Sequence, residues 1–351
     1  MEPQAEKKKS GVLPRVLGRV LLFLLVTVLL LAAFLYGVLF LLCRGPSPAA
    51  RELFVLSTHE TSAIGFLPRL ILSQAEIDAI ESARVQTVSE STDSSMVSVQ
   101  AAPDRAEADA WGYADEDGDG LILVPVAGES FTGHMLIVLD PSRVVLGCMP
   151  EHFYDRGYTL DELVQEFGAV AGINGGGFED PNGLGDGSAP DRAVVMNGEI
   201  YLPGKGTGYG FVGIDDRYIL HVGLESVEDL QSKHIQQGTG YGPILVVNGK
   251  EADPQTLLSG YNPRTAIGQR SDGAILMLVI AGRQPNSLGA TYADEAELML
   301  RFGAVNACNL DGGTSSLLWF DGGYLNNSAT VVGIRRIPTS FLVLPEGRDL
   351  P

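Results

Sequence analysis

The chain has 351 residues, of which 45% are hydrophobic and 19% charged, with 43 glycines, 19 prolines and 3 cysteines. This composition excludes a disordered acidic chain, a collagen-like repeat and a small disulfide-stapled domain. The net charge of −19 is uneven, because residues 1–51 hold seven basic and two acidic side chains, whereas residues 52–351 hold 17 basic and 41 acidic ones. So acidic a surface repels nucleic acid, and we expect no nucleic-acid partner.

An uncharged apolar segment lies near the N-terminus. Val20–Cys43 is long enough to cross a hydrocarbon layer of ~30 Å as a helix. A cleaved signal peptide ending near Pro46–Ala50 is the alternative, although its apolar part would be only ~7–15 residues long. Basic residues are more numerous before the segment than after it, which predicts a cytoplasmic tail over 1–19, a transmembrane helix over 20–43 and an extracytoplasmic remainder. We therefore expect a single-pass protein of the cell membrane.

The remainder divides into two regions. Residues 44–110 form a predicted stalk or accessory region with a helix from Ser73 to Ala83, which begins with the capping-box pair Ser73 and Glu76. Residues 111–351 contain short aliphatic and β-branched runs separated by turns, which is typical of strands. The predicted strands are Leu121–Val126, His134–Leu139, Val144–Cys148, Val170–Ile173, Ala274–Ile280 and Phe341–Leu344.

Local sequence signals also predict how these strands connect. Four turn pairs are typical of β-hairpins, namely Asn197-Gly198, Asn248-Gly249, Asp272-Gly273 and Asp321-Gly322. Two helices are predicted between strands, Leu160–Phe167 ending at Gly168 and Ala293–Phe302 ending at Gly303. The predicted fold class is therefore α+β, a single domain with a largely antiparallel or mixed β-sheet and a few helices, preceded by one N-terminal transmembrane helix.

An acidic turn precedes the first predicted strand. Asp115, Asp117 and Asp119 occupy the first, third and fifth places of a calcium loop, and Gly120 the sixth. The twelfth place, where calcium needs a bidentate Glu, is Val126. A solvated acidic turn is the favoured interpretation, with Ca²⁺ as the alternative. Apart from this alternative, we expect the protein to require no cofactor.

The cysteines indicate no redox chemistry. Cys43 lies at the membrane edge, while Cys148 and Cys308 lie in or beside apolar runs and are predicted to be small buried hydrophobic residues. A disulfide between Cys148 and Cys308 is left open, since sequence does not give their separation.

Two glycine-rich segments follow predicted strands. In the first, Asn174, Gly175, Gly176 and Gly177 lead to Glu179, and consecutive glycines allow backbone N–H groups to approach an anion. The second places Asp311, Gly312 and Gly313 before the hydroxyls of Thr314 and Ser315. A carboxylate at the end of a buried strand is suited to acid–base chemistry, whereas tight structural turns are the alternative for both segments.

An arginine lies between these segments. Arg264 and Thr265 begin a short predicted strand, and a guanidinium matches a phosphate or carboxylate in shape and charge. In so acidic a chain Arg264 is a candidate anion-binding residue, and a surface ion pair is the alternative.

The three segments, Asn174–Phe178, Arg264–Gly268 and Asn309–Ser316, resemble in this order the phosphodiester glycosidase family. The resemblance covers roughly His134 to Leu344 and is closest to bacterial membrane-anchored members, also labelled exopolysaccharide biosynthesis proteins. It implies hydrolysis of the glycosidic bond of a sugar-1-phosphodiester in a cell-surface glycan or wall polymer. Many relatives have Asp where this chain has Ala281, before Gly282 and Arg283.

This resemblance suggests roles for the candidate residues. Asp311 is the predicted base or nucleophile, and Glu179 is the second carboxylate. The predicted substrate-binding groups, including backbone N–H groups of the glycines, belong to Asn174, Gly175, Gly176, Arg264, Thr265, Gly312, Gly313, Thr314 and Ser315.

Other functions are also compatible with parts of the pattern. A membrane-anchored module that binds a phosphorylated exopolysaccharide without cutting it is the main alternative, which Ala281 favours slightly. A metal-dependent phosphodiesterase is disfavoured because the five histidines show no ligand spacing, and a serine hydrolase because no Gly-x-Ser-x-Gly motif occurs.

Overall fold

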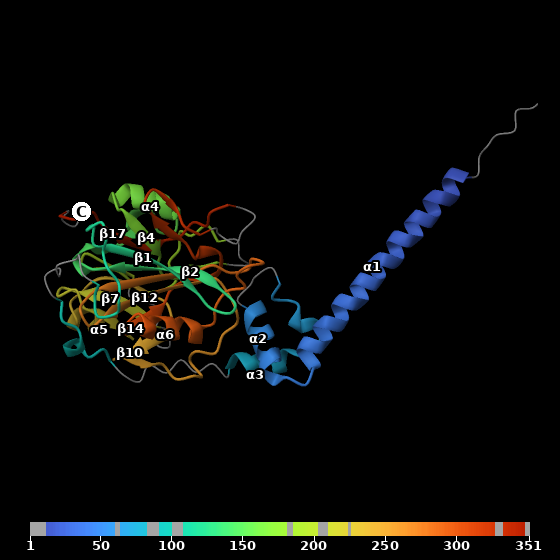
Figure 1. The fold of residues 1–351 in the computed structure, drawn as a ribbon, viewed down its shortest axis with the longest axis horizontal. Coiled ribbons are helices and arrows are strands. Elements are labelled where there is room, and N and C mark those ends of the chain that lie inside the picture. The colour runs from blue at the N-terminus through green and yellow to red at the C-terminus, as the bar shows by residue number, and fades with distance from the viewer. Residues whose placement is uncertain are drawn as a thin grey trace, which may run out of the picture.

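The computed structural model describes residues 12–59, 64–82, 91–99, 108–180, 185–202, 210–223, 226–326 and 333–347. Helix α1 (Val12–Arg44) extends away from the rest of the molecule (Figure 1). Its segment Val16–Arg44 is long and apolar enough to cross a membrane or to be a signal sequence, and its most apolar window is not buried in the protein. The basic residues at positions 7–9, which contribute to the predicted orientation, lie outside the described residues.

A small helical unit follows α1, made of α2 (Pro48–His59) and α3 (Gln74–Ser82). We call it the juxtamembrane unit. Leu39 and Cys43 of α1 are buried against its apolar side chains, which fixes the unit to the end of α1. The predicted helix start is confirmed, because the Ser73 N–H donates to Glu76 Oε2 at 2.8 Å. The sequence did not predict α2.

The remaining residues form three sheets, and every strand pairing among the described residues is antiparallel. The first sheet has the order β1 (Leu121–Ala127), β2 (Thr132–Val138), β13 (Ile275–Ile280), β12 (Arg264–Arg270), β14 (Ala304–Asn309), β10 (Ile244–Val247), β11 (Lys250–Glu251). The second has the order β16 (Gly323–Tyr324), β15 (Leu318–Phe320), β4 (Ala171–Asn174), β17 (Thr339–Val343), β3 (Val144–Cys148). The third has the order β6 (Glu199–Leu202), β5 (Val194–Met196), β9 (Ile235–Gly240), β7 (Phe211–Asp215), β8 (Leu220–Val222).

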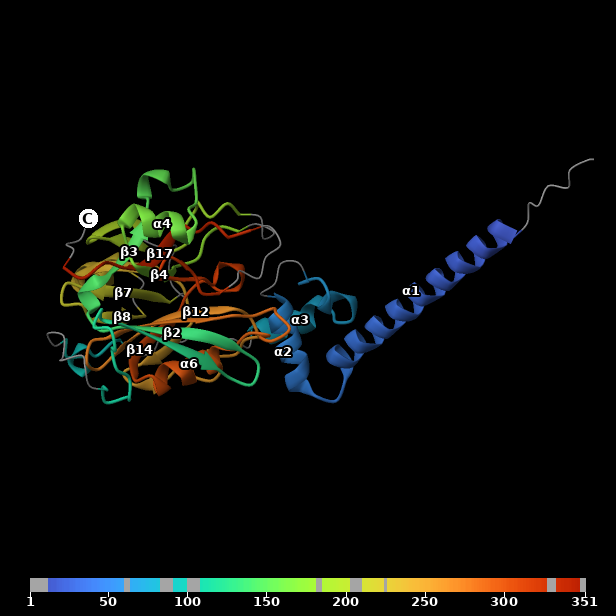
Figure 2. The ribbon, with the colours of Figure 1, turned by 45° about the horizontal axis from the view of Figure 1, so that its top comes forward.

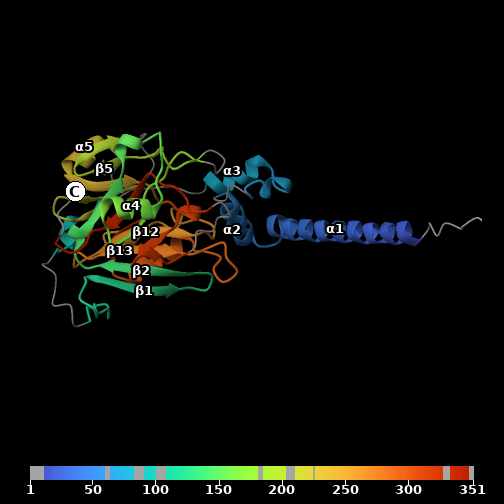
Figure 3. The same ribbon diagram turned by 90° about the horizontal axis from the view of Figure 1, so that it is seen from above.

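One apolar core lies between the inner faces of all three sheets. The outer face of each sheet is covered by one helix, namely α6 (Tyr292–Arg301) on the first, α4 (Leu160–Phe167) on the second and α5 (Val227–Ser232) on the third. Figure 2 shows the first and second sheets as separate layers, and Figure 3 shows β1 and β2 at one edge of the first. The predicted α+β fold is thus confirmed, and its sheets are antiparallel throughout the described residues.

The local sequence signals agree closely with the structure. All four predicted turn pairs join antiparallel strands, and both residues of Asn197-Gly198, Asn248-Gly249 and Asp321-Gly322 have positive φ, as a type I′ turn requires. The α4 capping box of Thr159 and Glu162 is present. The possible disulfide is not formed, because Cys43, Cys148 and Cys308 are free and buried.

Gly303 provides a direct test of this packing. It follows α6 with φ of +88°, and a Cβ placed on it would lie 2.1 Å from Nε1 of Trp111, whose ring lies under Arg270. Gly322 has a similar φ of +80° but open space around it. We expect Gly322→Ala to destabilise the protein by about 1 kcal/mol through backbone strain, and Gly303→Ala by about 2–4 kcal/mol through strain plus overpacking. Urea unfolding of the two variants measures the difference, and equal losses would contradict it.

Candidate active site

The side chain of Asn174, at the end of β4, connects two sheets. It is fully buried, and its Nδ2 donates to the backbone oxygen of Asp311 at 2.5 Å. Its Oδ1 accepts from Thr265 Oγ1 at 2.8 Å and from the Leu317 N–H at 3.1 Å. The amide thus holds β12 of the first sheet and both ends of the segment that joins β14 to β15. Thr265 is itself fully buried and acts here as a positioning residue.

The glycines after Asn174 are required for close packing. None of Gly175, Gly176 and Gly177 has a positive φ, but a Cβ on Gly177 would lie 2.8 Å from Cε2 of Tyr241. The Gly175 N–H donates to the backbone oxygen of Thr339, and the Gly176 N–H to its Oγ1, both at 2.9 Å. The prediction that these two N–H groups bind an anion is therefore wrong, because the neighbouring strand β17 already pairs with them.

Asp311 begins a tight turn that backbone hydrogen bonds hold in place. Its N–H donates to the Gly175 oxygen at 3.0 Å, and the Gly313 N–H donates to the oxygen of Pro263 at 2.9 Å. The prediction that the Gly313 N–H binds an anion is wrong for the same reason. Gly313 has φ of +62°, which a left-handed residue in this turn requires. Thr314 is half-buried within the turn.

The Asp311 carboxyl group lies in a half-buried position among polar side chains. Burial raises its pKa to about 6, while hydrogen bonds from Ser315 and Tyr241 lower it and the nearby charge of Asp191 raises it. The positive charge of Arg335 also lowers this pKa, by a smaller amount. A carboxylate that changes its protonation near neutral pH is suited to act as a base or a nucleophile.

Arg264 lies beneath the Asp311 turn and is 3% exposed. Its Nε donates to the Ala290 oxygen at 3.0 Å and its Nη2 to the Gly260 oxygen at 2.7 Å, while its guanidinium lies 4.1 Å from the Tyr292 ring centre. The Nη1 atom faces the turn, 3.9 Å from a Cβ placed on Gly312. Arg264 therefore supports the turn from below, and its predicted contact with substrate stays a prediction.

Two further arginines reach the site, and neither was among the residues predicted from sequence. Arg283 has φ of +57°, and its Nη2 lies 3.3 Å from a Cβ placed on Gly313 and donates to Asn262 Oδ1 at 2.9 Å. Arg335 lies over the Phe178 ring, 5.1 Å from its centre, and forms an ion pair with Asp180. The Gly282-Arg283 and Arg335-Arg336 pairs were visible in the sequence, but nothing local connects them with Asp311.

Glu179 is exposed at the start of the loop after Phe178, and its predicted catalytic role stays a prediction. The carboxylate whose charge acts on Asp311 is Asp191, whose N–H donates to the Gly177 oxygen at 3.3 Å. Asp191 lies in a segment without strand or helix periodicity, which is why sequence analysis missed it.

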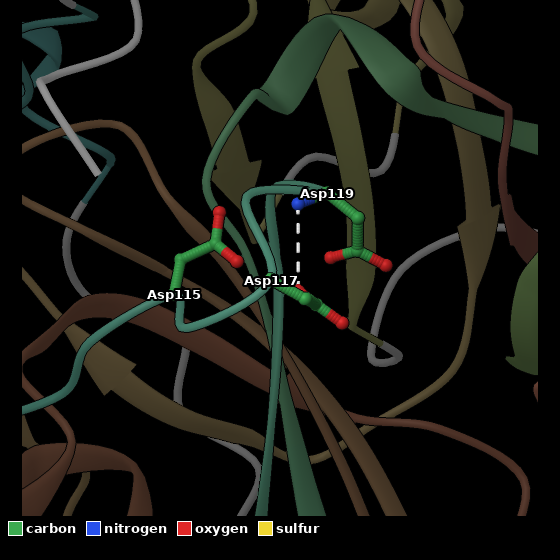
Figure 4. Close-up of side chains that lie close together, drawn as sticks. All are labelled: Asp115, Asp117 and Asp119. Carbon is green, nitrogen blue, oxygen red and sulfur yellow. Dashed lines mark hydrogen bonds between the residues drawn. The ribbon is translucent and has the colours of Figure 1, made fainter. Parts of the chain in front are cut away.

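The three aspartates of the possible calcium loop converge in the structure (Figure 4). Each provides an oxygen within 4.8 Å of the others, with Asp115 buried and Asp117 and Asp119 exposed. The Asp115 carboxylate accepts hydrogen bonds from the N–H groups of Gly118 and Gly120, which belong to the same loop. Val126, at the twelfth place, is buried in β1. A solvated acidic turn stays the favoured interpretation of this loop, with calcium as the alternative.

Comparison with known proteins shows the family to which the chain belongs. A profile described as phosphodiester glycosidase matches residues 167–344, half of the chain, and the chain belongs to this family. The SPbeta prophage-derived protein YomE of Bacillus subtilis is 33% identical over 160 residues, which cover 43% of this chain and 24% of YomE. The match thus spans about a quarter of that relative.

Two solved structures are similar to this chain, and the first of them shares its fold. The catalytic domain of zebrafish N-acetylglucosamine-1-phosphodiester α-N-acetylglucosaminidase is 19% identical, with a TM-score of 0.53, and the match covers 64% of this chain and 82% of that one. A protein of Burkholderia pseudomallei K96243 is 18% identical, with a TM-score of 0.47, over 61% of this chain and 74% of that one.

The raised pKa of Asp311 gives an expected pH dependence of stability. Because its pKa is about 6 in the folded protein and 3.8 ordinarily, the folded state binds more protons between these values, and stability falls as the pH rises from about 4 to about 6. Asp311→Asn removes this loss, and we expect the variant to gain about 1–2 kcal/mol relative to the unmodified protein between pH 4 and pH 7. Urea unfolding across this range measures it, with the exposed Asp155→Asn as control. Parallel curves for all three proteins would contradict the prediction.

Proposed function

We propose that the protein hydrolyses the glycosidic bond of a sugar-1-phosphodiester in a cell-surface glycan or wall polymer. The observation that supports this most directly is the Asp311 carboxyl group, half-buried on a rigid turn and next to a cluster of arginines. Membership of the phosphodiester glycosidase family is consistent with it.

The phosphate leaving group reduces the need for a general acid in this reaction. When the bond between the anomeric carbon and the phosphate oxygen breaks, the departing phosphate monoester is already an anion and needs little help from a general acid. The larger requirement is an activated nucleophile. In our proposal Asp311 takes a proton from water, the water oxygen forms the new bond to the anomeric carbon, and the bonding electrons leave with the phosphate.

The arginines supply the complementary charge. Arg335 acts electrostatically on Asp311, and the guanidinium of Arg283 lies against the Asp311 turn. A phosphodiester between these groups and the turn would be held by charge-assisted hydrogen bonds, with Ser315 positioning the carboxylate. In this arrangement Asn174 and Thr265 hold the turn and do not contact substrate.

We also propose where the reaction occurs. Helix α1 anchors the chain in a membrane, with the catalytic domain on the extracytoplasmic side, because basic residues precede the helix and the domain is strongly acidic. The substrate would then be a phosphorylated glycan outside the cytoplasm.

Replacing the proposed base tests the function. With the full chain in detergent and the methyl ester of N-acetylglucosamine-1-phosphate among a panel of sugar-1-phosphodiesters, we expect release of free sugar. Asp311→Asn should lower kcat/KM by about 10²–10⁴-fold, as expected for loss of a general base. The activity of the unmodified protein should rise with pH through about 6, as Asp311 loses its proton.

A matched pair of arginine variants controls for charge. Arg335→Gln removes a charge that acts on Asp311, whereas Arg336→Gln removes one that pairs with Glu162 on α4, and we expect only the first to raise KM. Full activity of Asp311→Asn would exclude that residue as the base. If the unmodified protein binds members of the panel but releases no sugar, the result would instead support a non-catalytic binding module. Ala281 is the observation that favours this alternative.

A further inference from the structure

A pocket of about 410 Å³ is lined in part by Ala281 and Gln284, which flank Gly282 and Arg283 in the sequence. One wall is the inner face of β1, β2 and β13, with Thr132, His134 and Ala281, and the opposite wall is Leu325 and Asn326 after β16. Pockets that bind small molecules have volumes of ~300–1,000 Å³, so this one is large enough for a monosaccharide. No residue predicted from the sequence lines it.

Strand register places this pocket beside the candidate active site. Thr265 of β12 pairs with Val279 of β13, and Val279 pairs with His134 of β2, so the three side chains form a row on one face of the first sheet. Neighbouring strands lie ~4.8 Å apart, and His134 is therefore about 10 Å from the residue that holds Asn174. His134 and Thr265, which contacts Asn174, thus lie on the same face of this sheet, two strands apart.

The opposite wall is connected to the same site. Asn326 Oδ1 accepts from the Leu318 N–H at 2.9 Å, and its Nδ2 donates to the Ser316 oxygen at 2.7 Å. Leu317, between these two residues, donates its N–H to Asn174. The pocket wall and the Asp311 turn are thus parts of one hydrogen-bonded segment.

The chemistry of the lining differs from that of the arginine side of the site. None of its described residues carries a formal charge at neutral pH, in a chain with a net charge of −19. Burial lowers the pKa of His134, which keeps its imidazole neutral, with one donor and one acceptor nitrogen. Gln284 and Asn326 add amides, while Leu325 offers an apolar surface for the face of a pyranose ring.

We propose that this pocket binds the uncharged sugar of the substrate, while the phosphate lies at the Asp311 turn. The inference rests on the proposed function and adds the position of the sugar to it. We call the pocket the sugar pocket. His134 is its central hydrogen-bonding residue, and the small side chain of Ala281 leaves room for the ring. The backbone of Ala281 is held by hydrogen bonds with Thr132 and Ser287.

Two variants test the sugar pocket by different means. His134→Leu removes both ring nitrogens at similar volume, and Ala281→Leu fills part of the space. Glu129→Gln, an exposed position in the same β1–β2 hairpin, is the matched control. We expect both pocket variants to raise KM for the phosphodiester about threefold to tenfold with little change in kcat, as for loss of one hydrogen bond. Thermal unfolding confirms that each variant is folded.

Binding to the inactive Asp311→Asn chain separates this inference from the proposed function. Neutral monosaccharides, including N-acetylglucosamine, and separately methyl phosphate are the probes, and ligand-detected NMR is the measurement. We expect His134→Leu and Ala281→Leu to weaken binding of the sugar and leave binding of methyl phosphate unchanged. If sugar binding depends on these residues although the unmodified protein hydrolyses nothing, the proposed function fails and the sugar pocket stands.

Three results of this binding experiment would overturn the sugar pocket. They are binding of no monosaccharide in the panel, sugar binding that both pocket variants leave unchanged, and weakened binding of methyl phosphate alone. The last result would place the anion, or the group beyond the phosphate, in this pocket. Hydrolysis with unaltered KM in both variants would leave the proposed function intact and exclude only the position of the sugar.

Discussion

The site depends on one buried amide. Asn174 donates to the backbone of Asp311 and accepts from Thr265 and Leu317, so it uses both ends of its side chain between two sheets. A carboxylate at this position has no N–H to donate, and an aliphatic side chain leaves three polar groups without their partner, each at a cost of about 1–3 kcal/mol. Because the backbone of Asp311 is fixed in this way, its carboxyl group has a defined position relative to Tyr241 and Ser315.

Burial is the strongest effect on the pKa of Asp311, and the negative charge of Asp191 acts in the same direction. Arg335 and the hydroxyls of Ser315 and Tyr241 favour the carboxylate, yet the pKa is raised to about 6 because the group is removed from water and Asp191 is near. An arginine in full contact with Asp311 would lower this pKa well below its ordinary range. Arg335 is thus close enough to act on the pKa of Asp311 without forcing the carboxyl group into its ionised form.

Sequence alone predicts the elements of this fold better than the contacts of its site. The strands and the capping box of Thr159 and Glu162 are local, since alternation and short-range hydrogen bonds determine them. The glycines after Asn174 stand out in the sequence, but the N–H groups of Gly175 and Gly176 pair with Thr339, a residue more than 160 positions away in sequence. Arg283 and Arg335 were missed for the same reason, because only the folded chain brings them to the Asp311 turn.

The segment Gly260–Tyr261 contacts both α2 and Arg264 of the candidate active site. The Tyr261 N–H donates to Ser57 Oγ of α2 at 2.9 Å, and a Cβ on Gly260 would lie 2.1 Å from the Ser57 nitrogen. The oxygen of that same glycine accepts from Arg264, which lies beneath the Asp311 turn. In all three ribbon views α2 lies between α1 and the sheets. A side chain at position 260 would clash with Ser57 of α2, and Gly260 therefore connects the position of α2 to the backbone that holds Arg264.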